Sequence, residues 1–357
     1  MEIAATKAWK EAVLKRVIYT NIPDAADSPA HDTVLYVGEQ VVLDTLRRKY
    51  RNLPRKYVPL PDGLVAVYWQ STPSLSLGVF AKRAFKPGDV VVRERPFLIA
   101  AADIGFDPSA GGKKVNPLIG NSVLGEILKL AERHFLPPNR DGFAALLTDY
   151  SLNPVHDLMK DMFRSLYVLC CNSFRIGEED LETSGVYKDY RLVSRVASRI
   201  NHSCSPNVVC RFDEATFTFN AVVTREIQIG EEILTTYCAL ELPRAERHRR
   251  LLPYNIDPCR CEACEMTDQE GSNQRRKMIY DFDIRKVIDL SPRKALKELI
   301  GVRNAIEEEN LQFLPVYPMV LQLMGSFWAK LGKSTLSEGL QKQADLYHSI
   351  HTSGPSR

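Results

Sequence analysis

The sequence predicts an α+β fold in which small β-sheets carry a helical insertion and are followed by a helical C-terminal region. Three observations predict it. Short runs rich in β-branched and aromatic residues alternate with turns between residues 64 and 94, and again between 215 and 237. Residues 105–190, which separate these two groups of runs, carry helical signals. Beyond residue 268 the apolar residues recur at helical spacing.

Residues 1–62 are predicted to form a mixed preface, with its clearest helical candidate at 41–50. The first strands are predicted at 64–69, 78–81 and 90–94, because valine, phenylalanine and tyrosine dominate these runs. Lys86-Pro87-Gly88-Asp89 carries the proline and glycine of a turn between the last two. We therefore expect three consecutive strands here.

The insertion contains one well-marked helix start. Asn153 is a good N-cap and Pro154 fits the first helical turn. The apolar positions that follow near helical spacing are Leu158, Met162, Leu166 and Leu169. A helical insertion that splits the sheet-forming parts of the chain is the predicted arrangement.

After the insertion, residues 215–219 alternate like a strand and 221–223 begin another. Gly230-Glu231-Glu232 marks a turn into a strand at 233–237. In the C-terminal region, Ser291 and Pro292 form a helix start. The apolar face expected after it comprises Leu296, Leu299, Ile300, Val302 and Ile306, and two more helices are predicted at 319–331 and 336–350.

Composition sets limits on function. A chain of 357 residues with 45% hydrophobic and 25% charged residues can bury a substantial core and divide into two or three units. Its formal net charge of +3 is too small to indicate nucleic acid as the main partner. With neither a basic-then-apolar leader nor a bilayer-length apolar run, we expect a soluble, intracellular protein, cytoplasmic or nuclear, without a membrane partner. We also expect it to be a monomer.

Two basic clusters stand out, at 47–56 and at 244–250. We interpret both as solvated helix faces, since runs of charge on predicted helices are usually exposed. A nuclear-import signal or a surface for an acidic partner is the alternative interpretation.

Three cysteines lie within six residues, at Cys259, Cys261 and Cys264. Tetrahedral zinc takes four nitrogen or sulfur ligands, so this cluster supplies three and a fourth must come from elsewhere. The alternative, a disulfide with one cysteine left over, fits a secreted protein better than this chain. The remaining cysteines outside the motifs are interpreted as small buried hydrophobic residues without chemistry: Cys170, Cys171, Cys210 and Cys238.

Three motifs occur in a fixed order along the chain: N-H-S-C-S-P-N at 201–207, G-E-E-I-L-T-T-Y at 230–237, and C-R-C-E-A-C at 259–264. Together they resemble those of the SET-domain protein lysine methyltransferases. The resemblance implies a SET β-fold with a pseudoknot, S-adenosylmethionine as cofactor and a zinc-bound post-SET segment. It also implies that Cys204 is the fourth zinc ligand beside the later three cysteines.

The resemblance further assigns a role to several residues. The threaded N-H-S-C segment would bring Asn201, His202 and Tyr237 together around the cofactor's methyl group. Tyr237 would be the catalytic residue, and Asn201 and His202 would hold the cofactor. C-N-S-F-R-I at 171–176 is similar to a run of the SET-plus-MYND subgroup, which makes Asn172 a further cofactor contact. No second metal-spaced set of cysteines and histidines lies between Glu94 and Cys170, so we expect no MYND finger, as in fungal-type relatives.

Two positions depart from the family pattern. Ser76-Leu77-Gly78 replaces the usual G-x-G, and Ile256 stands where phenylalanine is usual near the adenine. We expect cofactor binding to survive at Ser76 and Gly78, because the contacts of that loop come mainly from the backbone. Tyr254 can supply the aromatic face in place of Ile256.

The chemistry implied is an in-line methyl transfer from a sulfonium to a neutral amine. A free lysine is mostly protonated at neutral pH, but a nearby positive charge and desolvation both lower its pKa. Tyr237 would then orient the amine, and no strong base is needed, so His202 is not assigned that role. The expected partner is a protein substrate that presents a lysine.

The predicted organisation is a preface at 1–62, a SET domain at 63–240 with its insertion at about 105–190, a post-SET zinc segment at 241–268 and a helical region at 269–357. The C-terminal helices either wall the substrate cleft or stabilise the core. Two other functions stay open. The chain can be a SET-fold interaction protein with little or no catalysis, or an enzyme that methylates a small molecule.

Overall fold

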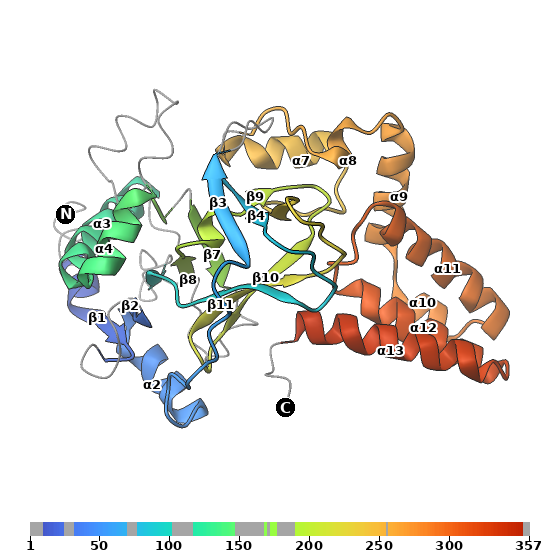
Figure 1. The fold of residues 1–357 in the computed structure, drawn as a ribbon, viewed down its shortest axis with the longest axis horizontal. Coiled ribbons are helices and arrows are strands. Elements are labelled where there is room, and N and C mark those ends of the chain that lie inside the picture. Colours follow the sequence, from blue (N-terminus) through green and yellow to red (C-terminus); the bar gives the residue numbers. More distant parts are fainter. Residues whose placement is uncertain are drawn as a thin grey trace, which may run out of the picture. The chain divides into compact units, whose positions relative to one another are not determined.

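The computed structural model describes residues 10–24, 32–69, 77–101, 117–146, 168–169, 172–176, 190–254 and 256–352. The chain divides into two compact units (Figure 1). The first unit comprises Met1–Pro59, Arg93–Arg199 and Phe212–Asn220, and the second comprises Leu60–Val92, Ile200–Arg211 and Ala221–Arg357. Because each unit is built from three separate stretches, the chain passes between the units repeatedly.

The first unit contains a five-stranded sheet in the order β1-β2-β6-β8-β7. The strands are β1 (Val17–Ile22), β2 (Val34–Glu39), β6 (Leu98–Ala101), β7 (Ser173–Ile176) and β8 (Tyr190–Val193). β2 and β6 pair in parallel, and the other pairs are antiparallel. The four residues of β6 are all buried, as expected of a central strand. The preface therefore supplies two strands of this sheet in addition to a helix.

The helix predicted at 41–50 is confirmed as α2 (Gln40–Lys49). The described part of the insertion forms α3 (Pro117–Ala131), η3 (Glu132–His134) and α4 (Pro137–Ala145), but it also contains the strand β7 near its end, so it is not helical throughout. Apolar residues of α3 such as Ile127 and Leu128 join the strand residues Leu35 and Leu98 in one buried cluster. The helix predicted from Asn153 falls outside the described residues, apart from Leu169.

Glu94 fixes a loop within the first unit. Its partly buried carboxylate accepts hydrogen bonds from the backbone N–H groups of Val196 at 2.9 Å and Ala197 at 2.8 Å. Ala197 begins η4 (Ala197–Arg199), the segment that leads directly into the N-H-S-C motif. Burial raises the pKa of Glu94, while these backbone donors lower it. The Glu94 carboxylate thus fixes the backbone of residues 196–197, which precede the N-H-S-C motif in the chain.

A three-stranded sheet has the order β10-β11-β5, with β5 (Val90–Glu94), β10 (Val208–Asp213) and β11 (Thr218–Val223). Three of the five boundaries between the units fall within these strands. The strand predicted at 215–219 is wrong, because residues 214–217 form a turn and Phe217 has a φ of 55°. The Asp213 side chain accepts from the N–H of Ala215 at 2.9 Å, which stabilises the turn locally. Residues 221–223 belong to the same strand as 218–220.

The second unit contains a four-stranded sheet in the order β3-β4-β12-β9. Its strands are β3 (Val65–Trp69), β4 (Leu77–Ala81), β9 (Asn201–His202) and β12 (Glu232–Thr235). The predicted strands at 64–69, 78–81, 90–94 and 233–237 are confirmed within one or two residues at each end. Gly88 has a φ of 92°, which explains the need for glycine in the predicted turn at 86–89.

The rest of the second unit is helical. Its elements are α7 (Arg244–Leu251), η5 (Leu252–Tyr254), α8 (Glu262–Glu265), α9 (Gln269–Asp281), α10 (Ile284–Ile288), α11 (Pro292–Glu308), α12 (Val316–Lys330) and α13 (Ser334–His351). The three predicted C-terminal helices are confirmed as α11, α12 and α13. In α11 Leu296, Leu299, Val302 and Ile306 are buried, whereas Ile300 is 38% exposed and does not belong to the apolar face.

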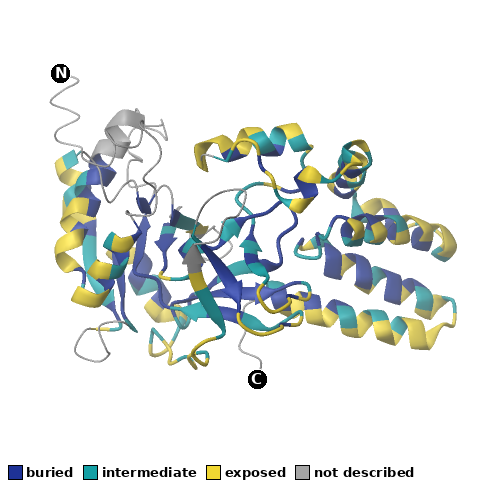
Figure 2. Ribbon diagram, turned by 45° about the horizontal axis from the view of Figure 1, so that its top comes forward, coloured by how far each residue is buried: buried dark blue, intermediate teal, exposed yellow. Residues whose placement is uncertain are grey.

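Helices α11, α12 and α13 pack side by side (Figure 1), with buried and exposed residues separated onto opposite sides of each helix (Figure 2). Their buried residues belong to one cluster that also contains Cys204, Cys259 and Cys264. None of the helices in the described ranges has both the length and the hydrophobicity that a bilayer crossing requires. The C-terminal helices and the cysteine-rich segment thus share one core.

Candidate active site and metal centre

Four cysteine thiols meet in the second unit. The sulfur atoms of Cys204, Cys259, Cys261 and Cys264 all lie within 4.8 Å of one another, and the Sγ atoms of Cys204 and Cys264 are 3.6 Å apart. Four sulfurs at about 2.3 Å from a tetrahedral zinc lie about 3.8 Å apart, so the spacing fits that ion. All four are free cysteines, and 3.6 Å is far longer than a disulfide bond, which argues against the disulfide interpretation.

The local fold explains why these cysteines meet. Cys204 follows β9 directly, and its N–H donates to the Sγ of Cys261 at 3.3 Å. Cys261 is the N-cap of the short helix α8, so that Cys264 returns toward it one turn later. Hydrogen bonding with the Cys204 thiol lowers the pKa of the Cys261 thiol and raises the pKa of the Cys264 thiol. Several thiolates at such short range need a cation, and a bound zinc would supply it.

Helix α7 places a buried guanidinium against the thiols. Arg247 is fully buried, and its Nε donates to the Sγ of Cys204 at 3.2 Å. Its Nη2 lies 3.8 Å from the Sγ of Cys264, and the Nε2 of His248 lies 3.4 Å from the same sulfur. The interpretation of residues 244–250 as a solvated helix face is therefore wrong for Arg247. Arg247 points into the core because the sulfur atoms of Cys204 and Cys264 accept hydrogen bonds from its guanidinium there.

Two segments of the sequence motifs run parallel in the sheet of the second unit. β9 pairs with β12 so that Asn201 lies opposite Leu234 and His202 opposite Thr235. Asn207 is fully buried, and its amide exchanges hydrogen bonds with the backbone of β12, to Glu232 O and from Leu234 N, both at 2.8 Å. Asn207 extends the parallel pairing beyond the two residues of β9. The N-H-S-C and G-E-E motifs are thus held together by backbone and amide bonds.

The Asn201 side chain joins three segments. Its Nδ2 donates to the backbone oxygen of Leu77 at 3.1 Å and to Oε1 of Glu232 at 2.8 Å. With both amide hydrogens engaged, its side chain has only Oδ1 to offer a ligand. A Cβ added at Gly78 would lie 2.5 Å from this same Glu232 oxygen, so the carboxylate occupies the space above the glycine. A side chain at position 78 would therefore displace the Glu232 carboxylate from its contact with Asn201.

His202 is held between the metal centre and Tyr237. Its Nδ1 accepts from the N–H of Tyr237 at 3.0 Å, and its Nε2 lies 3.4 Å from the Sγ of Cys204. Because Nδ1 accepts, a neutral ring carries its proton on Nε2 and donates it to the sulfur. Burial lowers the pKa of His202 to about 4, so the ring is neutral at pH 7. Both ring nitrogens are occupied, which leaves the backbone of His202 for any contact with a cofactor.

Tyr237 follows β12 and points its hydroxyl back to the end of η4. The hydroxyl donates to the backbone oxygen of Ile200 at 2.7 Å. The rings of His202 and Tyr254 flank it, with centroids 5.4 Å and 4.9 Å away. Tyr254 is 36% exposed, while Ile256 is partly buried against the core that holds the cysteines. The aromatic surface at this place in the second unit comes from Tyr237 and Tyr254.

Asn172 belongs to the first unit. It is buried, its backbone oxygen accepts from the Ser198 hydroxyl at 2.6 Å, and its Nδ2 has no hydrogen-bond partner among the described residues. A buried amide donor without a partner is costly, so this atom fits an acceptor on a bound ligand. Ser76, the other predicted cofactor contact beside Gly78, lies outside the described residues.

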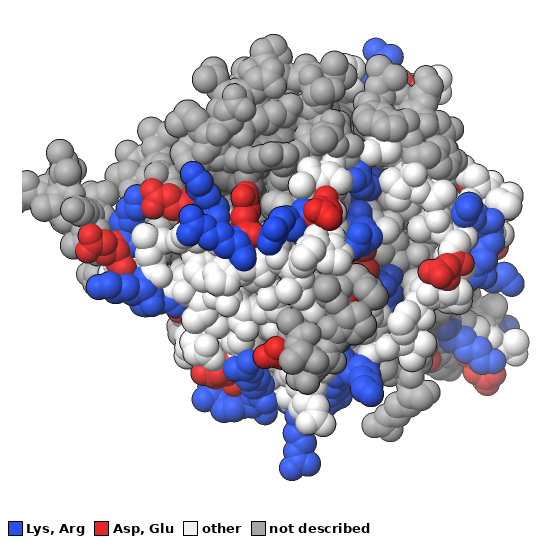
Figure 3. Space-filling model, turned by 60° about the vertical axis from the view of Figure 1, so that its left-hand side comes forward, with Lys and Arg blue, Asp and Glu red and all other residues white. Residues whose placement is uncertain are grey.

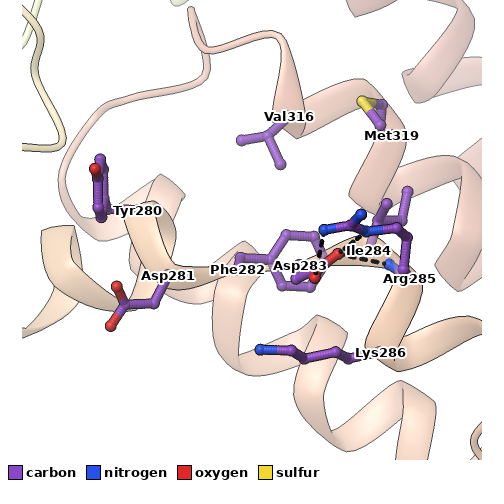
Figure 4. Close-up of a pocket in the computed structure, with 9 residues that line it drawn as sticks. All are labelled: Tyr280, Asp281, Phe282, Asp283, Ile284, Arg285, Lys286, Val316 and Met319. Carbon is purple, nitrogen blue, oxygen red and sulfur yellow. Dashed lines mark hydrogen bonds and ion pairs between the residues drawn. The ribbon is translucent and has the colours of Figure 1, made fainter.

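Other features of the structure are separate from these residues. A hollow of about 410 Å³ is lined by Tyr280, Asp281, Phe282, Asp283, Ile284, Arg285, Lys286, Val316 and Met319, none of which belongs to the motifs (Figure 4). Within it Asp283 and Arg285 bind each other. On the face drawn in Figure 3, acidic side chains are interspersed among the basic ones. Neither feature has the character of a second active site.

The sequence motifs did not reveal Arg247 or Glu232 as residues of the site. They did not reveal Arg276 either, which donates to the backbone oxygen of Cys204 at 3.1 Å and to the Glu309 carboxylate at 2.9 Å. Glu232 lies inside the G-E-E run, but its contact with Asn201 depends on the register of two strands, which the sequence does not show. Arg247 belongs to a basic cluster in which six other residues surround it, and nothing in the sequence distinguishes the buried arginine from the exposed ones. Arg276 and Glu309 are 33 residues apart and meet only in the folded chain.

Comparison with known proteins identifies the domain. Residues 76–238 match the family model described as the SET domain. The chain is 31% identical over 141 residues to the N-lysine methyltransferase SMYD2 of Homo sapiens, which covers 39% of this chain and 29% of that protein. It is 36% identical over 109 residues to the histone-lysine N-methyltransferase set5 of Schizosaccharomyces pombe, which covers 29% of this chain and 34% of that protein.

The chain thus spans about a third of the length of these relatives. A solved structure, the SET domain of LSMT bound to lysine and AdoHcy, aligns with 90% of this chain and 92% of that one, at 11% identity and a TM-score of 0.31.

Proposed function

Because residues 76–238 match the SET-domain family model, we propose that this protein transfers a methyl group from S-adenosylmethionine to a lysine side chain of a protein substrate. The observation that carries the proposal is the position of Tyr237 at the end of β12, beside the parallel strand that bears Asn201 and His202. The names of the relatives, N-lysine and histone-lysine methyltransferases, support the reaction class.

Tyr237 would orient the amine. Its hydroxyl donates its proton to the Ile200 oxygen, and a phenol oxygen can accept a hydrogen bond while it donates one, here from the incoming lysine nitrogen. An amine that donates to this oxygen has its lone pair directed away from it, and a fixed direction of approach accounts for much of the rate gain in such transfers. The neutral His202 ring, engaged on both nitrogens, keeps Tyr237 in place and takes no proton.

In the second unit, the cofactor would be held by Oδ1 of Asn201 and the backbone of His202, and Gly78 and Ser76 would contribute further backbone groups. Asn172, whose Nδ2 has no hydrogen-bond partner among the described residues, stays a predicted cofactor contact. Tyr254, with Ile256 beside it, would offer an apolar face to the adenine. When bound, S-adenosylmethionine supplies an electrophilic methyl group and a positive charge that lowers the pKa of a neighbouring lysine. The four cysteines would hold zinc in a structural role, since no ligand position is left open for catalysis.

The proposal extends to the setting of the reaction. Free thiols beside a metal site suit a reducing compartment, so we propose that the protein works inside the cell, in the cytoplasm or the nucleus. We also propose that it acts as a monomer and needs neither nucleic acid nor a membrane. The predicted absence of a MYND finger and the predicted domain limits remain predictions.

Replacing Tyr237 by phenylalanine tests the proposal. Y237F removes the hydroxyl that orients the amine and should reduce methyl transfer by about 100-fold, while leaving zinc content and the far-UV circular dichroism spectrum unchanged. The measurement is transfer of radiolabelled methyl from S-adenosylmethionine to polypeptides of a whole-cell extract.

The matched control is Y280F, at an exposed tyrosine on α9 in the same unit, which should keep wild-type activity. Undiminished labelling by Y237F would contradict the role of the hydroxyl. Failure of the wild-type protein to bind S-adenosylmethionine in calorimetry would contradict the proposed function itself, and label found only in small molecules would favour the small-molecule alternative.

A further inference from the structure

Two arginines lie completely inside the second unit. Arg247 on α7 and Arg276 on α9 both have side chains with no exposed surface. Arginine is among the residues least often buried, because desolvating a guanidinium costs several kcal/mol unless anions and acceptors surround it. Two such residues close to the same cysteine therefore need a common explanation.

The guanidinium of Arg247 donates hydrogen bonds to the cysteine centre and to one backbone carbonyl. Its Nε donates to the Sγ of Cys204 at 3.2 Å, and its Nη1 donates to the backbone oxygen of Leu242 at 2.6 Å. The longer contact from Nη2 reaches the Sγ of Cys264 at 3.8 Å. A neutral thiol is a weak acceptor, whereas a thiolate is an anion that can balance the guanidinium.

Arg276 connects the same centre to the C-terminal helices. Its Nη2 donates to the backbone oxygen of Cys204 at 3.1 Å and its Nη1 to the backbone oxygen of Leu240 at 2.6 Å. Its Nε donates to Oε2 of Glu309 at 2.9 Å. Glu309 is the C-cap residue of α11, and its carboxylate is completely buried.

Glu309 has further partners in this network. Its Oε1 accepts from the Nε of Arg275 at 2.7 Å and its Oε2 from the Ser272 hydroxyl at 2.8 Å. The backbone oxygen of Glu309 accepts from the Ser205 hydroxyl at 3.0 Å, so α11 reaches the residue next to Cys204 directly. All of these residues belong to the second unit.

The buried charges of this network need thiolates to balance them. Arg247 and Arg276 carry two positive charges and Glu309 carries one negative charge, whereas Arg275 is partly exposed and also pairs with Asp268 and Glu308. A zinc ion with four thiolates adds two negative charges, with Arg275 at the edge of the network. With four neutral thiols and no metal, the buried groups would hold one uncompensated positive charge. Such an excess is strongly unfavourable.

We propose that Arg247 and Arg276 are the counter-ions of the metal-bound thiolates, and that Glu309, through Arg276, couples the C-terminal helices to the metal centre. The arginines are positioning residues: their positive charges compensate the negative charge of four buried thiolates, and their hydrogen bonds hold Cys204 in its ligand geometry. This inference concerns the metal centre alone and stands whether or not the protein transfers methyl groups.

Measurements of zinc affinity test the counter-ion role. Zinc affinity is measured by competition with a chromogenic chelator in the full chain, for wild type and for R247M, a substitution that removes the charge and keeps much of the volume. Loss of the partner of a metal ligand typically weakens metal affinity 10- to 100-fold, and we expect R247M to fall in that range. R249M, at an exposed arginine on the same helix, is the matched control and should stay within about twofold of wild type.

Thermal unfolding with and without chelator separates charge from packing. A packing defect lowers the midpoints of the metal-bound and metal-free proteins equally. Loss of a counter-ion lowers the unfolding midpoint of the metal-bound protein. It does not lower the midpoint of the metal-free protein, because a buried positive charge has been removed from it. The difference between the two midpoints should therefore be smaller in R247M than in wild type. An unchanged difference, or a zinc affinity equal to that of R249M, would overturn the proposal.

R276M supplies the same test from the other arginine. Its matched control is K277M, at the next position on α9, where the lysine side chain is 72% exposed. R276M should also weaken zinc binding and reduce the difference between the two midpoints, and it keeps the proposal testable if R247M yields no folded protein. Replacement of zinc by cobalt should give the sulfur-to-metal charge-transfer band of four thiolates in wild type, with lower cobalt affinity in both arginine variants. Equal cobalt affinity in R276M and K277M would contradict the coupling through Arg276.

Discussion

His351, at the end of α13, is a histidine that burial keeps neutral. Burial lowers its pKa to about 4, and the neighbouring charges of Arg211 and His348 lower it further. Its Nε2 is buried without a hydrogen-bond partner among the described residues. The ring therefore gains nothing from a proton in the folded state, whereas in the unfolded chain it would titrate near 6.5.

The sign of the resulting pH dependence is fixed. Above pH 6.5 the ring is neutral in both states, and between pH 6.5 and about 4 only the unfolded chain holds the proton, so stability falls as the pH falls through this window. For a partly solvated group we expect a loss of about 1 kcal/mol between pH 7 and pH 5. In H351Q this part of the loss should vanish, as measured by urea unfolding at both pH values.

H348Q is the control for that measurement, since His348 is exposed on the same helix. It should keep most of the acid sensitivity of wild type. Acid sensitivity in H351Q equal to that of wild type would show that the His351 ring is protonated in the folded protein near its ordinary pKa.

Individual site residues were predictable to different degrees. The four cysteines could be found because their motifs fix their residue type and order, and the structure brings their sulfur atoms together. The neighbours of a motif residue were not predictable: Asn201 could not be matched to Glu232, nor Cys204 to Arg247, because those contacts depend on strand register and helix rotation. The roles of Tyr237, Asn172, Ser76, Gly78 and Tyr254 stay predictions that the variants above and ligand-bound structures can test.

At the scale of elements, the C-terminal end of α13 is held by one side chain. The Nη1 group of Arg211 donates to the backbone oxygens of Ser349 at 2.8 Å, Ile350 at 2.5 Å and Thr352 at 3.0 Å. The last carbonyls of a helix lack partners within it and carry the negative end of its dipole. A positive charge from β10 satisfies both needs.

Removing that charge should loosen the last turn of α13. R211M is expected to destabilise the second unit by about 1.5–3 kcal/mol, the usual value of hydrogen bonds to a charged group. Hydrogen–deuterium exchange should rise at residues 348–352 and stay unchanged in α12. K342M, at an exposed position of the same helix, should change neither; equal effects of the two variants would argue against the capping role.

The strength of the periodic signal decided which elements could be predicted. Helices α11, α12 and α13 are long and amphipathic, so their existence was evident, and β3, β4 and β5 were marked by β-branched residues and a glycine turn. The alternation at 215–219 was misleading, because Thr216, Thr218 and Phe219 have strand propensity while Asp213 stabilises a turn through its side chain. Local hydrogen bonding of an aspartate overrode the period-two pattern. The strands of the preface, V-I-Y-T-N-I at 17–22 and V-L-Y-V-G-E at 34–39, carry the same β-branched and aromatic residues, so a signal for them was present in the sequence and was missed.

At the scale of the whole molecule, zinc removal should act on one unit. Its proposed ligands, together with α7, α8, α9, β9 and β12, all belong to the second unit. Chelation should lower the unfolding midpoint of that unit by about 10 °C, since a structural zinc contributes several kcal/mol to folding. Differential scanning calorimetry on protein with and without chelator measures the shift.

Exchange measured by mass spectrometry localises the effect. After chelation, exchange should rise around Cys204 and across residues 240–282, and it should change little in the sheet β1-β2-β6-β8-β7 of the first unit. Elemental analysis of protein purified without chelator should find about one zinc per chain. Protein without zinc but with the same midpoint would contradict the structural role of the four cysteines.

The interleaving of the two units along the chain has a genetic consequence. Boundaries fall after Pro59, Val92, Arg199, Arg211 and Asn220, and three of these interrupt strands of the sheet β10-β11-β5. No single break in the gene can therefore separate one unit from the other, and recombination at any one point would leave both incomplete. Such a pair of units is inherited as a whole, so diversification must proceed by substitution within the units and by growth of surface insertions rather than by exchange of either unit.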